Sequence, residues 1–244
     1  MAATPWAAPV GGGHVAGGGV DEGGEGDGRP RYRMEVRLDP GRSTIEGTAQ
    51  VHWTNRSTAP AEEVAIHLYL NAFRSADTVY RREGASDGVE YEGTGSIELV
   101  EVTVDGQEVT PDVRGTHAFV PLPSPLGPGE GPVLIRMAFV SKLPPIVERT
   151  GCVEGFCMAG QWYPRVMRQA DDGTWPVRPY HHNAEYNGQV AHYEVSVQVP
   201  DGWRLVGTGE NRAEETASGG KRRYRFGGTL KDVAFAAGQG MGVV

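Results

Sequence analysis

Apolar and polar side chains alternate along long stretches of the chain. In residues 31–38 every second residue is apolar, and the same period of two recurs in residues 49–53, 64–70, 133–139 and 193–199. Such alternation is typical of β-strands that turn one face to a core and the other to solvent. The sequence therefore predicts strands in these five segments, with further strands at residues 100–104, 203–208, 224–226 and 233–235.

A hairpin is predicted where residues 100–104 run into Asp105 and Gly106. Both of these residues accept the positive φ angles that a two-residue hairpin turn requires. Val109 resumes the apolar pattern on the far side of the turn, so we expect the two strands to pair directly across it.

The composition agrees with a fold made of strands and turns. The 244 residues include 36 Gly and 17 Pro, and we find neither a convincing amphipathic helix nor an internal repeat. A succession of strands separated by turn signals favours an all-β fold, either an antiparallel sandwich or a large curved sheet. Residues 71–95 and 142–189 show no strand pattern. Loops of this length are commonly functional, so we look for the chemistry of the protein there.

Residues 1–30 stand apart from the rest of the chain. Ten of residues 11–28 are Gly, interspersed with acidic residues, and so little apolar surface cannot offset the entropy lost on ordering. A phosphate-binding loop is disfavoured, because no strand precedes the glycines and no G-K-[ST] follows them. We therefore expect a flexible Gly-rich tail over residues 1–30 and a single β domain over residues 31–244.

Charge and hydropathy argue against several kinds of partner. The net charge is −8 and no Lys/Arg cluster forms a basic stripe, so nucleic acid is not an expected ligand. No apolar run approaches the roughly 20 residues of a membrane span. Residues 1–9 lack the basic start and apolar core of a secretory signal. The compartment is unknown, although we favour a secreted, periplasmic or membrane-attached protein over a cytoplasmic one.

The two cysteines lie five positions apart. Gly151 and Gly155 give the chain around Cys152 and Cys157 the freedom to close a short loop, so a disulfide is expected in an oxidising compartment. The alternative is a pair of reduced thiols in a loop. Two thiolates are too few for a structural zinc site, and the spacing does not match a redox motif.

Three histidines lie on or beside predicted strands. His52 and His67 alternate with apolar residues, and His117 lies near a strand start. The alternation puts the first two on the outward face of their strands. We therefore expect all three to be solvated polar side chains with no special function.

A second group of histidines lies within residues 142–192. His181, His182 and His192 are close to Glu185 in the sequence, but Tyr186 stands where an H-x-x-E-H zinc motif needs its second His. No His is followed by Glu, so the H-E-x-x-H pattern is absent as well. We predict no metal site in this chain and expect a polar loop held by hydrogen bonds.

A series of short motifs follows in a fixed order between residues 31 and 240. They resemble the first domain of the zinc aminopeptidases related to aminopeptidase N and leukotriene hydrolase. The motifs are Tyr32-Arg33-Met34-Glu35-Val36-Arg37-Leu38-Asp39, Ile45-Glu46-Gly47, Val51-His52-Trp53-Thr54-Asn55, His67-Leu68-Tyr69-Leu70-Asn71-Ala72-Phe73, Gln161-Trp162-Tyr163-Pro164, Tyr193-Glu194-Val195, Val199-Pro200, Thr208-Gly209-Glu210 and Asp232-Val233-Ala234-Phe235.

The resemblance implies a saddle-shaped, all-β N-terminal domain built from curved sheets with long loops. In the family this domain packs on a thermolysin-like catalytic domain that carries a Gly-x-Met-Glu-Asn motif and an H-E-x-x-H zinc helix. Neither motif occurs in this chain. We therefore expect a truncated domain that is inactive alone and holds no cofactor, with zinc and the chemistry of peptide hydrolysis in the catalytic domain.

The resemblance also implies a role for Glu185 in binding the free N-terminus of a peptide. A fixed carboxylate would recognise an α-ammonium through a charge-assisted hydrogen bond, and Tyr163, Tyr180 and Tyr186 would exclude water around it. Many relatives have Asp-Glu-Pro here, whereas this chain has Asn-Ala-Glu-Tyr, which leaves the alignment of Glu185 open by a residue or two. The alternative is an ordinary solvated Glu in a loop.

Two other kinds of protein fit the same sequence. One is a stand-alone β-sandwich module that binds a carbohydrate or a protein partner, with Trp162, Trp175 and Trp203 as stacking platforms. The other is a purely structural domain of a larger assembly. Burial of the three tryptophans would argue against the first of these alternatives.

Overall fold

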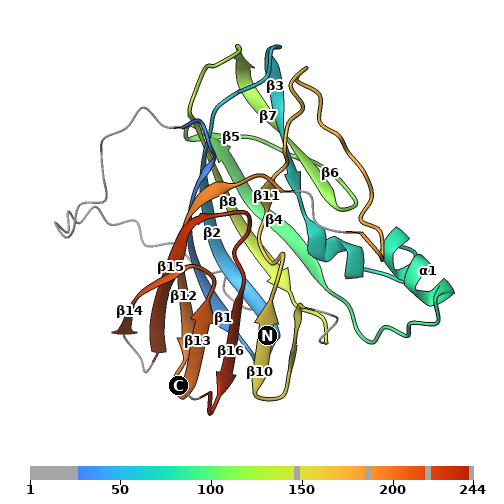
Figure 1. The fold of residues 1–244 in the computed structure, drawn as a ribbon, viewed down its shortest axis with the longest axis vertical. Helices are drawn as coiled ribbons and strands as arrows, with labels where there is room; N and C mark the ends of the chain where they lie inside the picture. The colour runs from blue at the N-terminus through green and yellow to red at the C-terminus, as the bar shows by residue number, and fades with distance from the viewer. Residues whose placement is uncertain (1–26, 146–148, 185–187, 218–220, 242–244) are drawn as a thin grey trace.

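The computed structural model describes residues 27–145, 149–184, 188–217 and 221–241, with the backbone alone for residues 213–217. This part of the chain folds into three β-sheets, one short 3-10 helix and one α-helix (Figure 1). The all-β fold class predicted from the alternating pattern is therefore confirmed. Residues 1–26 of the expected tail lie outside the described part of the chain.

The largest sheet has eight strands in the order β14-β15-β12-β1-β2-β8-β4-β5. Only the pairing of β1 with β12 is parallel among these neighbours. The strands are β1 Arg31–Asp39, β2 Thr44–Trp53, β4 Ser96–Val104, β5 Gln107–Glu108, β8 Val133–Lys142, β12 Ala191–Pro200, β14 Glu210–Ala217 and β15 Lys221–Leu230.

Two four-stranded sheets accompany the large one, in the orders β13-β16-β10-β9 and β11-β3-β7-β6. The first lies in front of β1 and β12 in Figure 1, and β3, β7 and β6 of the second lie toward the opposite end of the molecule. The strands are β3 Ala61–His67, β6 Asp112–Arg114, β7 His117–Leu126, β9 Gly151–Val153, β10 Phe156–Ala159, β11 Arg165–Val166, β13 Trp203–Gly207 and β16 Phe235–Gln239.

Inward side chains of the three sheets form one contiguous core. It includes Met34 of β1 and Ile135 of β8 from the large sheet, with Ile66 of β3 and Phe235 of β16 from the smaller sheets. Close packing is visible between β1 and β2, where a Cβ on Gly47 would lie 2.1 Å from the carbonyl oxygen of Glu35. Glycine is required at this point because any side chain would collide with the neighbouring strand.

The predicted hairpin at Asp105 and Gly106 is confirmed. Val104 of β4 pairs with Gln107 of β5, and both turn residues have positive φ angles, 49° for Asp105 and 82° for Gly106. The two stretches without a strand pattern, however, contain more regular structure than the sequence indicates. Strands β9, β10 and β11 lie within residues 142–189. One helix lies within residues 71–95, and a second helix runs from residue 69 into the start of that stretch.

The two helices are η1 Tyr69–Phe73 and α1 Val79–Ser86. Helix α1 begins after Thr78, whose hydroxyl accepts a hydrogen bond from the backbone N–H of Arg81. Only Tyr80 and Gly84 of α1 are buried, so the helix lacks the broad apolar stripe that reveals most helices in a sequence. The expectation of no helix in this stretch was therefore wrong. In the described residues no helix is long and apolar enough to cross a membrane.

Candidate functional site

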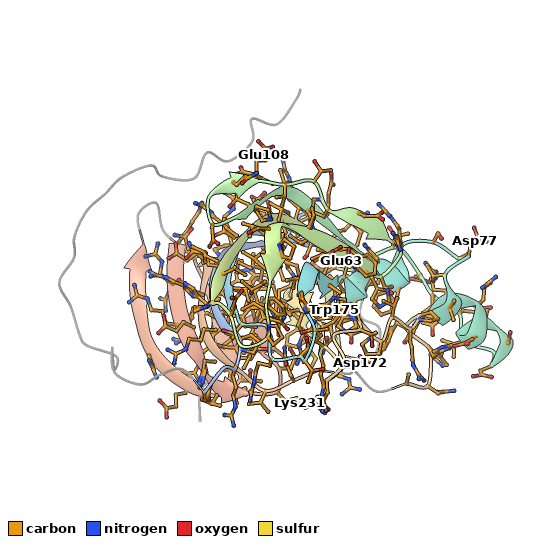
Figure 2. The ribbon with its side chains drawn as sticks, turned by 90° about the horizontal axis from the view of Figure 1, so that it is seen from above. Glu63, Asp77, Glu108, Asp172, Trp175 and Lys231 are labelled. Atoms are coloured by element: carbon orange, nitrogen blue, oxygen red, sulfur yellow. A yellow bond between two sulfur atoms is a disulfide. The ribbon has the colours of Figure 1, made fainter. Side chains whose placement is uncertain are left out.

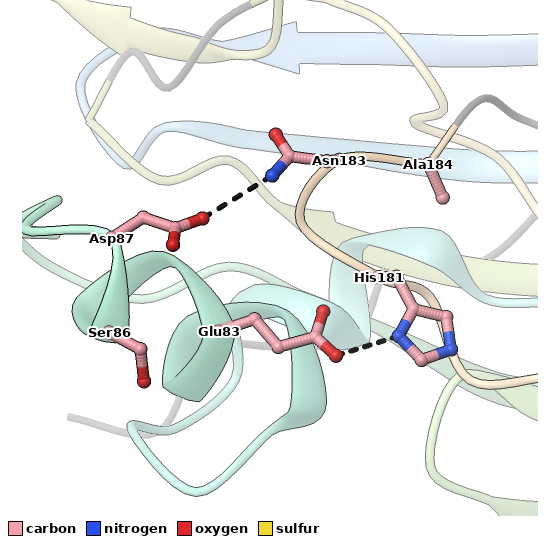
Figure 3. A pocket seen from close by; sticks show the side chains of 6 residues that line it. All are labelled: Glu83, Ser86, Asp87, His181, Asn183 and Ala184. Carbon is pink, nitrogen blue, oxygen red and sulfur yellow. Dashed lines mark hydrogen bonds and ion pairs between the residues drawn. The ribbon is translucent and has the colours of Figure 1, made fainter.

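The candidate site is a shallow pocket between helix α1 and the loop of residues 180–184. Figure 3 shows the loop facing the helix, with the His181 ring directed toward Glu83 and the Asn183 side chain toward Asp87. The described residues that line the pocket are mostly polar: Glu83, Ser86, Asp87, His181, Asn183 and Ala184. Its two lining carboxylates come from α1 and the residue that caps it, whereas its imidazole and amide come from the loop.

Three hydrogen bonds join the helix to the loop. Nδ1 of His181 lies 2.8 Å from Oε1 of Glu83, and the backbone N–H of His182 donates to Oε2 of the same carboxylate at 3.0 Å. The side-chain amide of Asn183 donates to Oδ2 of Asp87 at 3.3 Å. Segments nearly one hundred residues apart in the sequence are therefore joined by a carboxylate of α1 and by that of its C-cap residue, Asp87.

Aromatic rings pack beneath these hydrogen bonds. Tyr180 is buried and stacks on Tyr80 of α1, with ring centroids 5.2 Å apart and an interplanar angle of 6°. Tyr180 also meets Tyr69 edge to face at 5.4 Å, and the His182 ring lies 5.2 Å from that of Tyr80. The loop is therefore anchored on a floor of aromatic rings as well as by its polar contacts.

Tyr91 completes the support of the loop from the chain that follows α1. Its hydroxyl lies 2.7 Å from Nδ1 of His182. The ring of Tyr91 passes so close to α1 that a Cβ on Gly84 would lie 2.3 Å from the Tyr91 hydroxyl oxygen. Glycine at position 84 is therefore needed for Tyr91 to reach the loop, although it weakens the helix.

The electrostatics of the pocket favour negative charge on the helix. The hydrogen bond from His181, followed by the one from the His182 backbone, holds the pKa of the Glu83 carboxyl below its ordinary value. A carboxylate that accepts hydrogen bonds is stabilised in its charged form. Glu83 therefore remains ionised at neutral pH and is available as an acceptor for the loop.

The sequence-predicted site residues lie in different surroundings. Glu185 and Tyr186 lie outside the described residues, directly after the loop of residues 180–184. Tyr180 belongs to the aromatic floor of the pocket. Tyr163 is 1% exposed and contacts the Tyr32 and Tyr193 rings in the core, rather than lying open beside the loop.

Tyr163 belongs to a buried polar network centred on Asp232. The Tyr163 hydroxyl donates to Oδ1 of Asp232 at 2.7 Å and lies 3.1 Å from the Tyr193 hydroxyl. The side-chain amide of Gln161 and the backbone N–H of Val233 also donate to the Asp232 carboxylate. The Gln161-Trp162-Tyr163-Pro164 motif is therefore joined to the Asp232-Val233-Ala234-Phe235 motif inside the fold.

Arg165 of β11 carries the positive charge of this network. Its side chain is 2% exposed, and Nη1 lies 3.6 Å from Oδ1 of Asp232. Its guanidinium donates to the carbonyl oxygens of Gln189, at 3.2 Å, and Lys231. Burial acts against the charge, but Tyr163, Tyr193 and Asp232 outweigh it and raise the pKa of Arg165, so the side chain is a cation.

Arg165 also lies against the chain that continues from the candidate loop. A Cβ on Gly188 would lie 1.9 Å from Nη2 of Arg165, so the guanidinium packs directly on the backbone there. With the hydrogen bond to Gln189, this contact fixes the chain three residues after Glu185. The described residues on both sides of Glu185 are thus attached to the body of the domain.

Two of the expected solvated histidines are buried instead. His67 of β3 and His117 of β7 are 5% and 4% exposed, and their ring centroids lie 5.3 Å apart. The expectation was wrong because the face of this small sheet that carries the histidines is also covered: Met167 packs on Ala65 and Phe119 of the same face, and Tyr69 stacks on His67. Alternation predicts exposure only where one face meets water.

The environment of His67 opposes its protonation. Neither ring nitrogen has a hydrogen-bond partner, and the ring stacks on Tyr69 with centroids 4.4 Å apart. Burial first, then the proximity of His117 and Arg165, lower the pKa of His67 to about 3. His67 is therefore a neutral side chain at neutral pH.

The three tryptophans do not offer an open stacking surface. Trp162 and Trp203 are buried in the core, with 0% and 5% exposure. Trp175 is half-buried and packs near Trp53 at a centroid distance of 5.9 Å. In Figure 2 Trp175 lies over the interior of the molecule, whereas Asp77 and Glu108 lie at its outer edge. The sugar-binding alternative therefore has no aromatic platform among these residues.

A disulfide joins Cys152 of β9 to Cys157 of β10, the pair for which the sequence predicted one. The two residues are cross-strand neighbours, so the bond closes a short hairpin that lies beside β16. Potential metal ligands do not form a cluster in the described residues. Among the described residues no group of three or more His, Cys, Asp or Glu side chains could hold a metal ion.

Sequence reasoning missed the residues that support the loop. Glu83 and Asp87 lie in a stretch where no helix was expected, and the signal that could have located it is Thr78 as an N-cap. Arg165 and Asp232 lack a local signal, because their partners are distant in the sequence. Arg165 directly follows one of the motifs that carried the family resemblance, and Asp232 is the first residue of another, so the motif positions were the available clue.

Comparison with known proteins finds similarity at the level of structure. No protein-family model matches the chain, and neither does a curated protein. The M1 zinc metallopeptidase of Deinococcus radiodurans matches 86% of this chain with a TM-score of 0.58 and 15% identity. A mutant of it bound to a Tyr-Ser-Ala substrate matches at a TM-score of 0.58 and 14% identity.

The structure of a two-domain M1 zinc metallopeptidase mutant bound to L-tryptophan also matches 86% of the chain, at a TM-score of 0.58 and 15% identity. The chain spans less than half of these solved structures, 42% of the first two and 43% of the third. At such low sequence identity, the structural similarity establishes the fold alone. The family resemblance seen in the motifs is confirmed at that level: this chain has the fold of the corresponding part of an M1 zinc metallopeptidase.

Proposed function

We propose that this chain is the non-catalytic β domain of a zinc aminopeptidase. In this proposal it packs on a thermolysin-like catalytic domain and helps to bind the free N-terminus of a peptide substrate. The observation that carries the proposal is the match of 86% of the chain to structures of M1 zinc metallopeptidases. The motif order in the sequence supports the same conclusion independently of the coordinates.

The segment proposed to meet the substrate is the one that contains Glu185. Its described flanks support such a role, because residues 180–184 are held on α1 and the Gln189 carbonyl is held by Arg165. A carboxylate can select for an α-ammonium only if it is kept in place. Tyr186 is the neighbouring aromatic wall in this proposal, while Tyr180 anchors the loop on α1 and Tyr163 belongs to the Asp232 network that includes Arg165.

The zinc of the proposed enzyme belongs to the catalytic domain. The described residues of this chain offer no group of ligands for it. Hydrolysis of a peptide needs a metal-bound water and a general base, neither of which this chain is proposed to supply. The purified chain should therefore not cleave aminoacyl arylamides. Cleavage that a chelator abolishes would contradict this assignment of roles.

The proposed location is outside the cytoplasm, in a secreted, periplasmic or membrane-attached protein. The disulfide between Cys152 and Cys157 supports this proposal, because such bonds persist mainly in oxidising compartments. Thiol titration of unfolded, unreduced protein isolated from its natural source tests it. Two free thiols would argue for a reducing compartment.

The experiment that tests the substrate role is Glu185→Ala in the peptidase that we propose contains this chain. Loss of a charge-assisted hydrogen bond should cost on the order of 1.5 to 3 kcal/mol. This corresponds to a fall in kcat/KM of roughly ten- to hundredfold. Inhibitors with a free amine should weaken to a similar degree, and inhibitors without the amine should bind as before.

A matched control is Glu154→Ala, which removes an exposed carboxylate from the turn between β9 and β10. It should leave both classes of inhibitor unaffected. Equal losses for the two inhibitor classes in Glu185→Ala would indicate a collapsed loop rather than a lost contact to the amine. An unchanged kcat/KM would make Glu185 a solvated bystander and refute the proposed role.

A further inference from the structure

Helix α1 has features that the helix itself does not explain. Glu83 lies in the last turn of the helix and Asp87, four positions on, is the residue that caps its C-terminus, where a negative charge is unfavourable. The helix has only eight residues, and isolated helices of that length are marginal in water. The loop of residues 180–184 supplies hydrogen-bonding partners to both carboxylates.

The contacts with the loop are specific in their geometry. Glu83 uses both carboxylate oxygens, one for the His181 ring and one for the backbone N–H of His182. Asp87 accepts from the next residue, Asn183. Successive loop residues thus meet successive turns of the helix. Exposed ion pairs contribute little by themselves, but Glu83 also accepts a hydrogen bond from a backbone N–H, which fixes the position of the loop backbone.

The orientation of His181 follows from the same contact. Its Nδ1 faces the Glu83 carboxylate, so this nitrogen carries a proton in the hydrogen bond. The other ring nitrogen, Nε2, is directed away from Glu83, as the drawn ring shows (Figure 3). Because 48% of the His181 side chain is exposed, this nitrogen can meet a bound molecule from solution.

We propose that Glu83 is a positioning residue that fixes the backbone of residues 181–183 and the ring of His181. The effect of this positioning on substrate binding rests on the proposed function, in which the fixed loop leads into the segment that binds the peptide N-terminus. Asp87 is a weaker partner in the same task, because it holds only the Asn183 side chain. Neither carboxylate is a catalytic residue in this proposal.

The direct test follows hydrogen exchange of the His182 backbone amide in the whole chain by NMR. In Glu83→Ala this amide loses its acceptor, and its exchange should become about tenfold faster, the size expected for one charge-assisted hydrogen bond. Alanine is the best helix former, so α1 itself is not weakened. Unchanged exchange of the His182 amide in a folded Glu83→Ala protein would overturn the proposal.

Two further variants distinguish a positioning role of Glu83 from a general effect of removing one negative charge. Glu90→Ala removes a carboxylate from an exposed position beyond α1 and should leave His182 exchange unchanged. Glu83→Gln keeps the length of the side chain and one acceptor oxygen, so it should restore part of the protection lost in Glu83→Ala. Equal acceleration by Glu90→Ala and Glu83→Ala would show an effect of charge alone and refute the positioning role.

The consequence for substrate is measured in the proposed peptidase. Glu83→Ala should raise KM for peptides several-fold with a smaller change in kcat, because the loop orients the bound amine and not the reacting bond. Faster amide exchange with an unchanged KM would leave Glu83 as the positioning residue and refute the proposed role of the loop in substrate binding. The two failures are therefore distinguishable.

Discussion

Two polar clusters join distant parts of this chain, and they differ in burial. The first surrounds Asp232 and Arg165 inside the fold, where Tyr163 and Gln161 complete its hydrogen bonds. The second, at the surface, joins α1 to residues 181–183. Arg165 is 2% exposed, whereas the Glu83 side chain is 42% exposed. The same types of interaction therefore operate in different dielectric surroundings.

The difference indicates what each cluster contributes. In the buried cluster a charge cannot be left unpaired, because water cannot replace a lost partner. In the surface cluster water and salt can replace any partner, so each contact contributes little to folding. The buried cluster should therefore control whether the domain folds, and the surface cluster should control only the position of one loop. Each of the following predictions tests this division.

Arg165→Met should give the largest effect. It removes the cation that faces Asp232 and the donors to the Gln189 and Lys231 carbonyl oxygens. Asp232 keeps its other hydrogen-bond donors, and its side chain is partly exposed to water. The loss of folding free energy should therefore lie near the lower end of the range for a broken buried ion pair. We expect the free energy of unfolding to fall by about 3 kcal/mol. Urea denaturation of the purified chain measures it.

A control variant, Arg165→Lys, keeps the positive charge but loses the planar guanidinium group that donates hydrogen bonds to two carbonyl oxygens at once. It should be more stable than Arg165→Met and less stable than the natural protein. If Arg165→Met unfolded at the same urea concentration as the natural chain, the buried cluster would be no more important to folding than the surface one.

His67 gives the next largest effect, and it appears as a dependence on pH. Its folded-state pKa is lowered to about 3 by burial, His117 and Arg165, so the unfolded state binds the proton more tightly. Stability should be highest above the ordinary pKa of about 6.5 and should fall as the pH drops below it. At pH 5 the loss should be about 2 kcal/mol.

The test compares His67→Leu with His52→Leu, whose imidazole is exposed on β2. Unfolding free energies of both variants and the natural chain are measured at pH 7.5 and pH 5. The difference between the two pH values should shrink by about 2 kcal/mol in His67→Leu and should remain in His52→Leu. Equal pH dependence in both variants would mean that burial does not suppress protonation of His67.

The regularity of the strands explains how much of this fold the sequence predicts. Period-two alternation located β1, β2, β8 and β12, because one face of each strand meets the core and the other meets solvent. It misjudged the end of β3, where His67 is buried on a face that other segments cover. Local pattern cannot show how a distant segment covers a sheet.

The supports of the candidate site could not be predicted for a related reason. Glu83 lies on a helix stabilised by contacts with residues far away in the sequence, and only Thr78 marks its start. Arg165 and Asp232 are 67 positions apart in the sequence, and Arg165 lies near the Tyr163 motif that could be recognised. The family motifs therefore indicated where the buried cluster lies, although they did not indicate that it is structural.

Tyr163→Phe is a finer probe of the buried cluster. It removes only the hydroxyl that donates to Asp232 and lies beside Tyr193, and it keeps the ring in the core. The remaining donors to Asp232 limit the damage, so unfolding should become easier by about 1.5 kcal/mol. Urea denaturation measures this change. A loss as large as that of Arg165→Met would show that the hydroxyl and the cation act as one unit.

Glu83→Ala should give the smallest effect on stability. Its carboxylate is exposed, so water can satisfy the loop groups that it leaves behind, and alanine favours the helix. The urea midpoint should therefore stay close to that of the natural chain, while exchange of the His182 amide becomes faster. A midpoint shift as large as that of Tyr163→Phe would show that the surface cluster also holds the fold together. A local change without a global one would instead place α1 and its loop among the parts of the protein that can move without unfolding, as binding loops commonly do.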